Sequence, residues 1–558
     1  MRDKQSINEV YSQYPLVCRI ADALREKIIY YCRDKIQQMR ALKTKLIFLF
    51  FIGCVLSLNA QKLPDNWYNL DLNADKVMGV SSNKAYETIL KGKPSRKVIV
   101  AVIDGGVEVD HPDLIEHIWT NIKEIPNNGI DDDHNGYVDD IHGWDFIGGK
   151  TEDVEHDNLE ITRIYKKYKS VFENNAEAIK QNQEHYKWYV LAKKEYLKKY
   201  AEIEKKLKDQ QEIQSWMEKM QDQNKDKKIT TDDVNNFPDG DSLLQQFKLS
   251  LFKSIDKGLS FEDVKKTIDS RCKLYSNQLN YNYNLDYDSR KIVGDHYDDS
   301  SERNYGNNEV EGPEASHGTH VAGIIGAVRN NNLGVDGVAD SVSIMVLRVV
   351  PDGDERDKDI ANAIRYAAEN GASIINMSFG KSFPYDKNAV DNAVRFAVSK
   401  DVLFIHASGN ESLNLDSIGR RYPNPDYANG KGSAKSNWIV VGAVAASGNP
   451  GPFSNYGKKK VDVFAPGVAI NSTVLDGKYG KKNGTSMACP VVAGVAAMIR
   501  SYHPELSARK VKKIILKTVY KPTETVPQPG NDKVKISWKK LCKTAGIVNA
   551  YNALNSIH

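Results

Sequence analysis

The chain has 558 residues, of which 41% are hydrophobic and 27% charged, a composition typical of a folded protein with several domains rather than a disordered chain. The 77 Lys and Arg residues against 73 Asp and Glu leave a net charge of +4, and this near balance argues against a dedicated nucleic-acid-binding protein. A mean hydropathy of −0.52 excludes a polytopic membrane protein. The 6 cysteines show no regular spacing, so they indicate neither a disulfide framework nor a zinc site, and we expect mostly buried free thiols.

An export signal is the first element that the sequence predicts. Residues 39–60 combine a basic start, an uncharged apolar run of 13 residues and a small residue, Ala60, at the exit, as secretory signal peptides do. The run is shorter than the about 20 residues that span a bilayer, so no stable transmembrane anchor is expected after signal removal. Cleavage after Ala60 is preferred, with lipidation at Cys54 as the alternative. Residues 1–38 are an upstream extension. Because Met39 is an alternative start, whether residues 1–38 are translated is left open. The expected location is the periplasm, the cell surface or the medium.

Apolar runs rich in β-branched residues alternate with helical patterns further along the chain. The pattern predicts strands buried on both faces of a sheet, and the helices between them indicate an α/β fold with a doubly wound, mainly parallel sheet. The expected strands are 97–103, 343–350, 372–377, 402–407 and 438–443, and helices are expected at 359–369 and 389–399.

A long segment without Gly or Pro, between Lys150 and Phe237, interrupts this alternation. Tyr189, Tyr196 and Ile203 belong to a stripe that recurs every three or four residues, which predicts amphipathic helices in a hairpin or small bundle. Its role stays open between a solvated spacer, a lid and a docking surface for an unknown partner. The expected organisation is an N-terminal lead at 61–96, an α/β domain in two parts at 97–150 and 301–558, and a mainly helical insertion at 151–300.

Three short blocks in the α/β parts offer an acid, an imidazole and a hydroxyl: Asp104, His317 and Ser486. A serine hydroxyl is a weak nucleophile unless a base takes its proton, and a histidine oriented by a carboxylate does this near neutral pH. Asp104 ends a predicted parallel strand, where α/β sheets place their sites. His317 and Ser486 each precede an apolar run, so both are expected in the first turn of a buried helix.

These blocks closely resemble the subtilisin-like serine proteases (subtilases, peptidase S8). The resemblance is carried by Asp-Gly-Gly at 104–106, Ser-His-Gly-Thr-His-Val-Ala-Gly at 316–323 and Asn-Gly-Thr-Ser-Met-Ala-Cys-Pro at 483–490. It covers about 97–150 and 301–558 and implies a subtilisin-type sheet with a long helical insertion between the catalytic Asp and His. It also implies a secreted serine endopeptidase that cleaves polypeptides through an acyl-enzyme and needs no cofactor for catalysis.

The resemblance also implies roles for single residues. Asp104 orients His317, which acts as general base and then acid, and Ser486 attacks the scissile carbonyl. Asn410, in an Ala-Ser-Gly-Asn turn, supplies the oxyanion hole. The cleft segment that would pair with an extended substrate contains Ser378, Phe379 and Gly380. Gly105 departs from the pattern, which has Ser or Thr there, and we expect weaker hydrogen bonding to Asp104. The resemblance makes His320, His111, Asp113 and Cys489 framework residues.

A calcium loop is the last predicted site. Asp131, Asp133 and Asn135 alternate before a Gly, and Asp139 follows, as in the opening of a loop that binds Ca²⁺ through oxygen ligands. His142 replaces the usual Glu at the twelfth position, so an Asn/Asp-rich turn is the alternative. A second loop start at 222–226 has Lys in place of the Gly and is the weaker candidate.

A second function class also accounts for the sequence. The alternative to a protease is a protein with the subtilase fold, restrained or lost activity, and a helical insertion that binds a partner. Labelling of the serine with a fluorophosphonate separates the two.

Overall fold

The structure is a computed structural model that describes residues 63–224, 228–418 and 420–557. Nearly all of these belong to one compact unit, Asp65–His558. The upstream extension, the export signal with Cys54 and Ala60, and part of the second loop start at 222–226 lie outside the described residues. No helix in the described ranges has both the length and the apolar character that crossing a bilayer requires.

A seven-stranded parallel sheet forms the centre of this unit, which confirms the predicted α/β class. The predicted runs correspond to five strands, and two further strands, at the two edges of the sheet, were not among them. The strand order is β2-β3-β1-β4-β5-β6-β7. Their bounds are β1 Val98–Asp104, β2 Gly143–Asp145, β3 Val342–Arg348, β4 Ile374–Met377, β5 Leu403–Ala407, β6 Trp438–Val444 and β7 Val463–Pro466.

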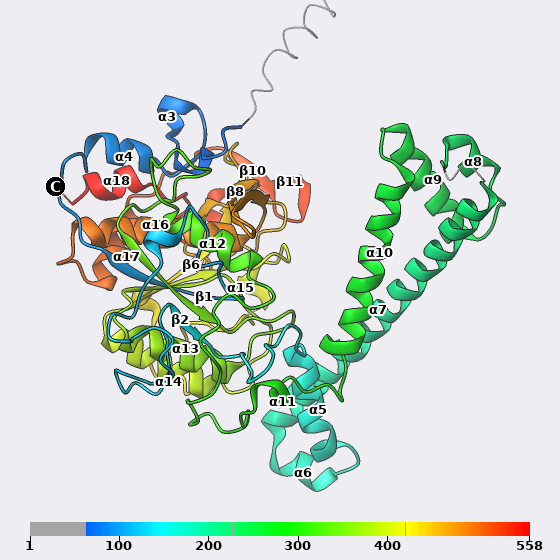
Figure 1. The fold of residues 1–558 in the computed structure, drawn as a ribbon, viewed down its shortest axis with the longest axis horizontal. Coiled ribbons are helices and arrows are strands. Elements are labelled where there is room, and N and C mark those ends of the chain that lie inside the picture. The colour runs from blue at the N-terminus through cyan, green and yellow to red at the C-terminus, as the bar shows by residue number, and fades with distance from the viewer. Residues whose placement is uncertain (1–62, 225–227, 419, 558) are drawn as a thin grey trace, which may run out of the picture. The chain divides into compact units, whose positions relative to one another are not determined.

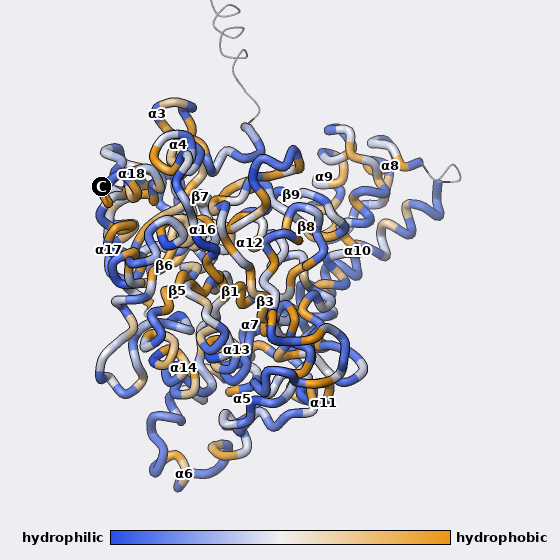
Figure 2. The backbone as a smooth tube through the Cα atoms, turned by 60° about the vertical axis from the view of Figure 1, so that its left-hand side comes forward, coloured by the Kyte–Doolittle hydropathy of each residue, from blue (hydrophilic) through white to orange (hydrophobic). Residues whose placement is uncertain are grey.

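Helices cover both faces of the sheet (Figure 1). Helices α12 (Ser316–Gly326) and α16 (Thr485–Tyr502) pack against each other and against β1. On the other side, α13 (Asp357–Glu369) and α14 (Lys387–Ser399) form one apolar core with Ala101 and Ile103. Because both faces are covered, the strands are mainly apolar, and Figure 2 shows most of β1 and β5 in the colours of hydrophobic residues.

Smaller elements surround the sheet. The lead contains η2 (Trp67–Asn69), α3 (Leu72–Asp75) and α4 (Ser82–Thr88), and the backbone N–H of Ala550 donates to Val80 O at 2.7 Å, which holds it against the C-terminal segment. Two antiparallel hairpins follow the sheet. Their bounds, with those of the remaining helices, are β8 Ile470–Val474, β9 Lys478–Lys482, β10 Thr525–Gln528, β11 Asn531–Ser537, η3 Ile115–His117, α15 Leu415–Ile418, η5 Lys435–Asn437, α17 Ala508–Lys517, η6 Trp538–Lys540 and α18 Ala550–Asn555.

Helices dominate the segment between β2 and α12. Its 41-residue helix α7 lies side by side with α10 (Figure 1). Three apolar clusters hold it: one around Tyr165 and Tyr196, a small one in which Ala192 packs with Phe383, and a distal one around Met217, Leu251 and Ile268. The bounds are α5 Glu160–Phe172, α6 Ala176–Gln181, α7 Gln183–Gln223, α8 Thr231–Asn236, α9 Ser242–Asp256, α10 Phe261–Asn277, a short π-helix η4 Gln278–Asn282 and α11 Arg290–Val293.

A buried ion network joins α5 to the sheet. Lys381, which follows β4 and has a fully buried side chain, pairs with Glu160 at 2.6 Å and with Asp357 at 2.7 Å. Arg163 pairs with Glu160 at 3.0 Å. Burial alone would lower the pKa of Lys381, but the carboxylates of Asp357 and Glu160 outweigh it and raise that pKa. The charged form is therefore the stable one, and the network requires all of its members because a buried ion without its partner is costly.

Candidate active site

The acid and the imidazole lie in contact. Asp104 is the last residue of β1 and is 2% exposed, and His317 is the second residue of α12. His317 Nδ1 donates to Asp104 Oδ1 across 2.7 Å. Since a carboxylate only accepts hydrogen bonds, this contact assigns the proton to Nδ1 and leaves the lone pair on Nε2.

The second oxygen of that carboxylate is less well held. The backbone N–H of Gly105 donates to Asp104 Oδ1 at 2.8 Å, whereas Asp104 Oδ2 is buried without a hydrogen-bond partner among the described residues. Gly105 brings no side-chain hydroxyl to this position. The lack of a hydrogen bond to Asp104 Oδ2 agrees with the weaker hydrogen bonding to Asp104 that is expected when a Gly stands at position 105.

Ser486 lies at the start of α16, as its second residue. Its hydroxyl donates to the carbonyl oxygen of Ser378 at 3.0 Å. Within the part of the chain that the structure describes, this hydroxyl has no hydrogen bond to His317, whose ring is held through Nδ1. Catalytic hydrogen bonds are commonly long or unformed in ligand-free proteins and tighten when substrate binds.

Asn410 is oriented by the residue next to Ser486. Its Oδ1 accepts from the backbone N–H of Thr485 at 2.9 Å and from the Thr485 hydroxyl at 3.0 Å. The same hydroxyl accepts from the backbone N–H of Gly409 at 3.0 Å. Because two donors hold Oδ1, the amide cannot be flipped without losing them, and the exposed Asn410 presents its NH₂ group at the start of α16.

The segment after β4 runs beside this constellation. Ser378 Oγ donates to the carbonyl of Ser486 at 2.9 Å, and His406 Nε2 donates to Phe379 O at 2.9 Å. Burial, with the nearby charge of Arg421, lowers the pKa of His406 to about 3, so the ring is neutral and its Nε2 carries the proton. The backbone of Gly380 forms no hydrogen bond to another described backbone group, which leaves a strand edge able to pair with an extended peptide.

His320 and His111 lie against the hairpin of β8 and β9. His320 Nε2 lies 3.0 Å from both Ile470 O and Gly480 O, and burial lowers the pKa of this ring to about 3. His111 Nε2 lies 3.1 Å from Lys478 O. Both nitrogens therefore face carbonyl groups of the hairpin, which is a framework contact and not a metal-binding one.

Asp113 and Cys489 are also held by their surroundings. Asp113 accepts from Asn331 Nδ2 at 2.7 Å, and the Cys489 thiol lies 3.6 Å from Met377 O. Burial raises the pKa of the Cys489 thiol, which keeps it protonated and unreactive. The cysteines in the described ranges are free thiols, and Cys489 and Cys542 are buried.

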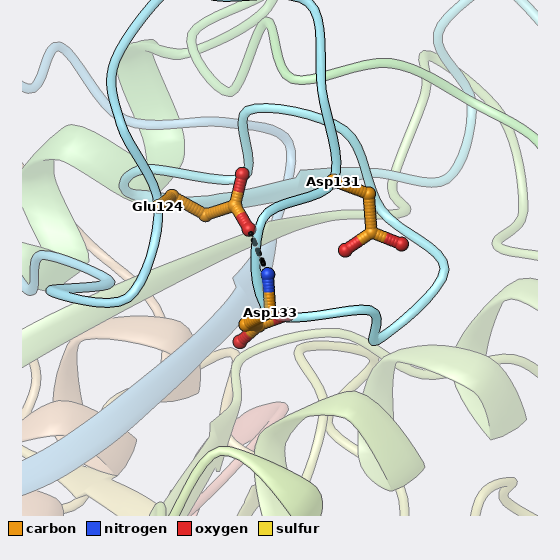
Figure 3. Close-up of side chains that lie close together, drawn as sticks. All are labelled: Glu124, Asp131 and Asp133. Carbon is orange, nitrogen blue, oxygen red and sulfur yellow. Dashed lines mark hydrogen bonds between the residues drawn. The ribbon is translucent and has the colours of Figure 1, made fainter.

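Acidic side chains converge in the predicted calcium loop (Figure 3). Carboxylate oxygens of Asp131, Asp133 and Glu124 all lie within 4.8 Å of one another. The backbone N–H of Asp133 donates to Glu124 Oε1 at 3.0 Å, which holds the Glu against the loop. Glu124 was not among the predicted ligands, since it lies before the loop and no spacing rule points to it.

The other two predicted ligands have different neighbours. Asn135 Oδ1 accepts from the backbone of Tyr137 at 2.8 Å. The Asp139 carboxylate accepts from the backbone N–H groups of Asn128 at 3.1 Å and Gly129 at 2.9 Å. The structure thus groups Asp131 and Asp133 with Glu124, while Asn135 and Asp139 hold the turn itself.

Lys482 is a residue near the imidazole that the sequence did not single out. Its Nζ donates to the carbonyl of Ser316 at 2.7 Å and to the Ser316 hydroxyl at 2.9 Å, directly before His317. Burial lowers the pKa of Lys482, although Asp104 and Glu314 oppose this. Only the fold, which brings β9 against α12, reveals the contact.

The family follows from comparison with known proteins. The family model described as the subtilase family (peptidase S8) matches residues 95–537. The chain therefore belongs to the subtilase family, and the resemblance seen in the sequence is confirmed.

Individual relatives agree with this assignment. The chain is 41% identical over 199 residues to Subtilisin NAT of Bacillus subtilis subsp. natto, which covers 36% of this chain and 49% of that protein. It is 40% identical over 199 residues to a subtilisin of Bacillus pumilus, covering 36% of this chain and 68% of that one. The chain spans about half the length of the first curated relatives that it matches. A solved structure of proteases from Pseudoalteromonas arctica PAMC 21717 aligns with a TM-score of 0.45 at 21% identity, covering 90% of this chain and 99% of that one.

Proposed function

We propose that the chain is a serine endopeptidase that hydrolyses peptide bonds in polypeptide substrates through an acyl-enzyme. The observation that carries the proposal is the 2.7 Å contact between His317 Nδ1 and Asp104 Oδ1 in a member of the subtilase family. A buried carboxylate that fixes the tautomer of a half-exposed imidazole is the arrangement that a serine nucleophile needs.

Each of the proposed catalytic residues has its own role in the reaction. Ser486 Oγ turns from the Ser378 carbonyl to His317 Nε2, which takes its proton as the oxygen attacks the scissile carbonyl. Asp104 stabilises the imidazolium that forms. The negative oxygen of the tetrahedral intermediate accepts from the Asn410 amide and the Ser486 backbone N–H. His317 then donates its proton to the leaving amine, and a water molecule, activated in the same way, releases the acyl group.

A fluorophosphonate probe tests this proposal directly. The folded wild-type chain is expected to be labelled covalently, and Ser486→Ala is expected to abolish labelling. Ser501→Ala is the matched control, because Ser501 lies on the same helix and its hydroxyl donates within that helix, to Met498 O at 2.9 Å. Absence of labelling in folded wild type would overturn the proposal and favour a binding protein whose insertion holds a partner.

We also propose that the cluster of Glu124, Asp131 and Asp133 binds a structural calcium ion. Its donors are all carboxylate oxygens within 4.8 Å of one another, and oxygen ligands suit Ca²⁺. Ca²⁺ would brace the loop before β2 and takes no part in bond cleavage. A heat melt with and without a chelator tests it: a lower midpoint with chelator in the wild type, and no difference in Asp131→Asn, is the expected pair of results. An unchanged wild-type midpoint contradicts the site.

Export is the third part of the proposal. The segment at 39–60 has the features of a secretory signal, with cleavage proposed after Ala60. N-terminal sequencing of the mature protein is expected to begin at Gln61. A mature N-terminus that still contains residues 39–60 would contradict the proposal.

A further inference from the structure

An arginine lies beside the proposed catalytic groups. A Cβ atom placed on Gly380 would lie 3.0 Å from Arg421 Nη2, and one placed on Gly409 would lie 2.7 Å from Arg421 Cζ. The guanidinium therefore sits between the cleft segment and the turn that carries Asn410. Gly409 has a φ of +100°, and any larger residue there would collide with the guanidinium as well as strain the backbone.

The hydrogen-bonding capacity of this guanidinium is largely unused. The Arg421 side chain is 17% exposed, and its Nε is buried without a hydrogen-bond partner among the described residues. Its ion pair is with Glu411, where Nη1 and Oε1 are 3.6 Å apart, longer than a hydrogen bond. Glu411 also accepts from Asn455 Nδ2. Since arginine is rarely buried without a hydrogen-bonded partner, the position calls for an acceptor from outside the chain.

The geometry of the proposed reaction says which part of a substrate reaches Arg421. The scissile carbonyl lies between Ser486 Oγ and the Asn410 amide, and the residues before it pair with the free edge at Gly380. The substrate residue that carries the scissile carbonyl then places its side chain in the gap between the cleft segment and the Asn410 turn. Arg421 closes the far end of that gap.

The charges around Arg421 favour an anion. Arg421 also borders a pocket of about 280 Å³ whose walls carry seven Lys and Arg side chains and two carboxylates. This pocket is not lined by the cleft segment or by Asn410 and Ser486, so it adds positive charge behind Arg421 and is not itself the substrate gap. The adjacent Arg420 is engaged elsewhere, because its Nη2 pairs with Glu195 Oε1 on α7 at 3.2 Å. Two acids face Arg421. Glu411 has a side chain that is 52% exposed, so it can move aside. Glu355 is buried, and burial raises its pKa to about 8 although Lys381 and Arg421 oppose this, so it offers Arg421 little negative charge at neutral pH.

We propose that Arg421 makes this protease select substrates with an acidic side chain, Glu or Asp, on the acyl side of the cleaved bond. The inference rests on the proposed function, because it assigns the substrate class of the same site. A planar guanidinium binds a carboxylate through two parallel hydrogen bonds, and an uncharged amide or an alkyl chain would leave the N–H donors unpaired. Arg421 is thus a specificity residue.

Matched peptides that differ only at the acyl-side residue test the proposal. The wild type is expected to cleave after Glu with kcat/KM on the order of 100-fold higher than after Gln, since a site built for a charged partner rejects the neutral isostere. Arg421→Gln is expected to bring the ratio close to one. Arg420→Gln, which removes a neighbouring charge of the same sign, is the control and is expected to keep the wild-type ratio. Equal cleavage after Glu and Gln by a wild type that the fluorophosphonate labels overturns the inference and leaves the proposed function standing.

A binding measurement separates the inference from catalysis. The full chain carrying Ser486→Ala is titrated with fluorescent peptides that end in Glu or in Gln, and anisotropy is recorded. Tighter binding of the Glu peptide by at least about tenfold, lost in Ser486→Ala/Arg421→Gln, supports acidic recognition even without turnover. Glu411→Gln removes the competing acid and is expected to strengthen binding of the Glu peptide alone, which tests the site if Arg421→Gln fails to fold. Equal binding of both peptides by Ser486→Ala, which retains Arg421, overturns the inference.

Discussion

The parallel sheet and the helical insertion hold their parts by different means. In the sheet, backbone ladders and helix starts place Asp104, His317 and Ser486. Charged side chains lie at the strand ends there, and they include one fully buried pair, Arg348 with Asp145 at 2.6 Å. At the base of the insertion, charged side chains are buried, with Lys381 and Glu160 both fully covered. Along its length α7 packs into three apolar clusters, one of which joins Ala192 to Phe383 and one of which is distal.

This difference shows where each region tolerates change. A backbone ladder keeps its hydrogen bonds when a single side chain is lost, whereas a buried ion network is destabilised, because each removed member leaves an opposite buried charge with fewer partners. The network also lies next to the cleft, since Lys381 directly follows Gly380. The base of the insertion is therefore joined to the substrate edge through Lys381, and we expect its distal end to be independent of that edge.

The largest expected effect comes from Lys381→Met. It leaves Glu160 and Asp357 without their shared cation and should lower the free energy of unfolding by about 3–5 kcal/mol, the usual cost of breaking a buried pair. Urea denaturation measures it, and the KM for peptides should rise because the edge at Gly380 shifts. Lys193→Ala, on the exposed pair with Glu173, is the control and should leave the midpoint unchanged. A wild-type midpoint in Lys381→Met would remove the contrast between the two regions.

The next effect belongs to the sheet side and should touch catalysis more than folding. Asn410→Ala is expected to lower kcat by about 10²–10³, a figure known from the oxyanion-hole donor of subtilisin and carried over from there. Asn410→Asp keeps the oxygen that accepts from Thr485 and loses only the NH₂ donor, so it should lose at least as much activity while keeping the melting midpoint. Retained kcat in Asn410→Asp would exclude Asn410 from the oxyanion hole.

Acid should weaken the cleft side of the sheet through His406. The pKa of His406 in the folded chain, about 3, lies below the ordinary value of about 6.5. Between these two pH values His406 is therefore protonated in the unfolded chain and neutral in the folded chain. Stability contributed by neutral His406 is complete above about pH 6.5 and falls by about 1.4 kcal/mol per pH unit below it. His406→Gln should remove that part of the pH dependence of the free energy of unfolding, measured by urea denaturation between pH 6 and 4. His296→Gln, which changes a histidine that is 86% exposed, should leave this pH dependence unchanged. An unchanged slope in His406→Gln would contradict the assignment.

The smallest expected effect is confined to the distal cluster. Ile268→Val removes one buried methyl group and should cost about 0.5–1.5 kcal/mol in local stability. Hydrogen exchange should accelerate in α9 and α10, and peptide hydrolysis should stay at the wild-type rate. A changed kcat/KM would show that the distal helices are coupled to the cleft after all.

The sheet was the most predictable part of the molecule. Strands covered on both faces carry apolar runs, so β1, β3, β4, β5 and β6 could be predicted directly, while the two edge strands β2 and β7 were not predicted. The motif residues were also visible, because their local flanks carry the signal.

Contacts that depend on tertiary folding were not predictable. Glu124 joins Asp131 from outside the loop, Arg421 reaches the cleft from a turn without a motif, and Lys381 meets Glu160 across 221 positions. Charged residues are common and pair through space, so no spacing in the sequence distinguishes these from solvated neighbours. For the same reason the buried ion contacts at the base of the insertion could not be predicted, although the helices of the insertion could.

The closed base of the insertion has a consequence for folding kinetics. The N–H of Leu159 donates to Asn282 O at 3.0 Å, and Asn158 Nδ2 donates to Tyr281 O at 2.7 Å, so the two ends of the insertion meet. The entropy of loop closure grows with the length of flexible chain between two contacts. Once local helix pairing has brought these two ends together, β1 can pair with β3 as if a short connection joined the two strands. A large insertion in the middle of a parallel ladder then slows folding far less than its length implies.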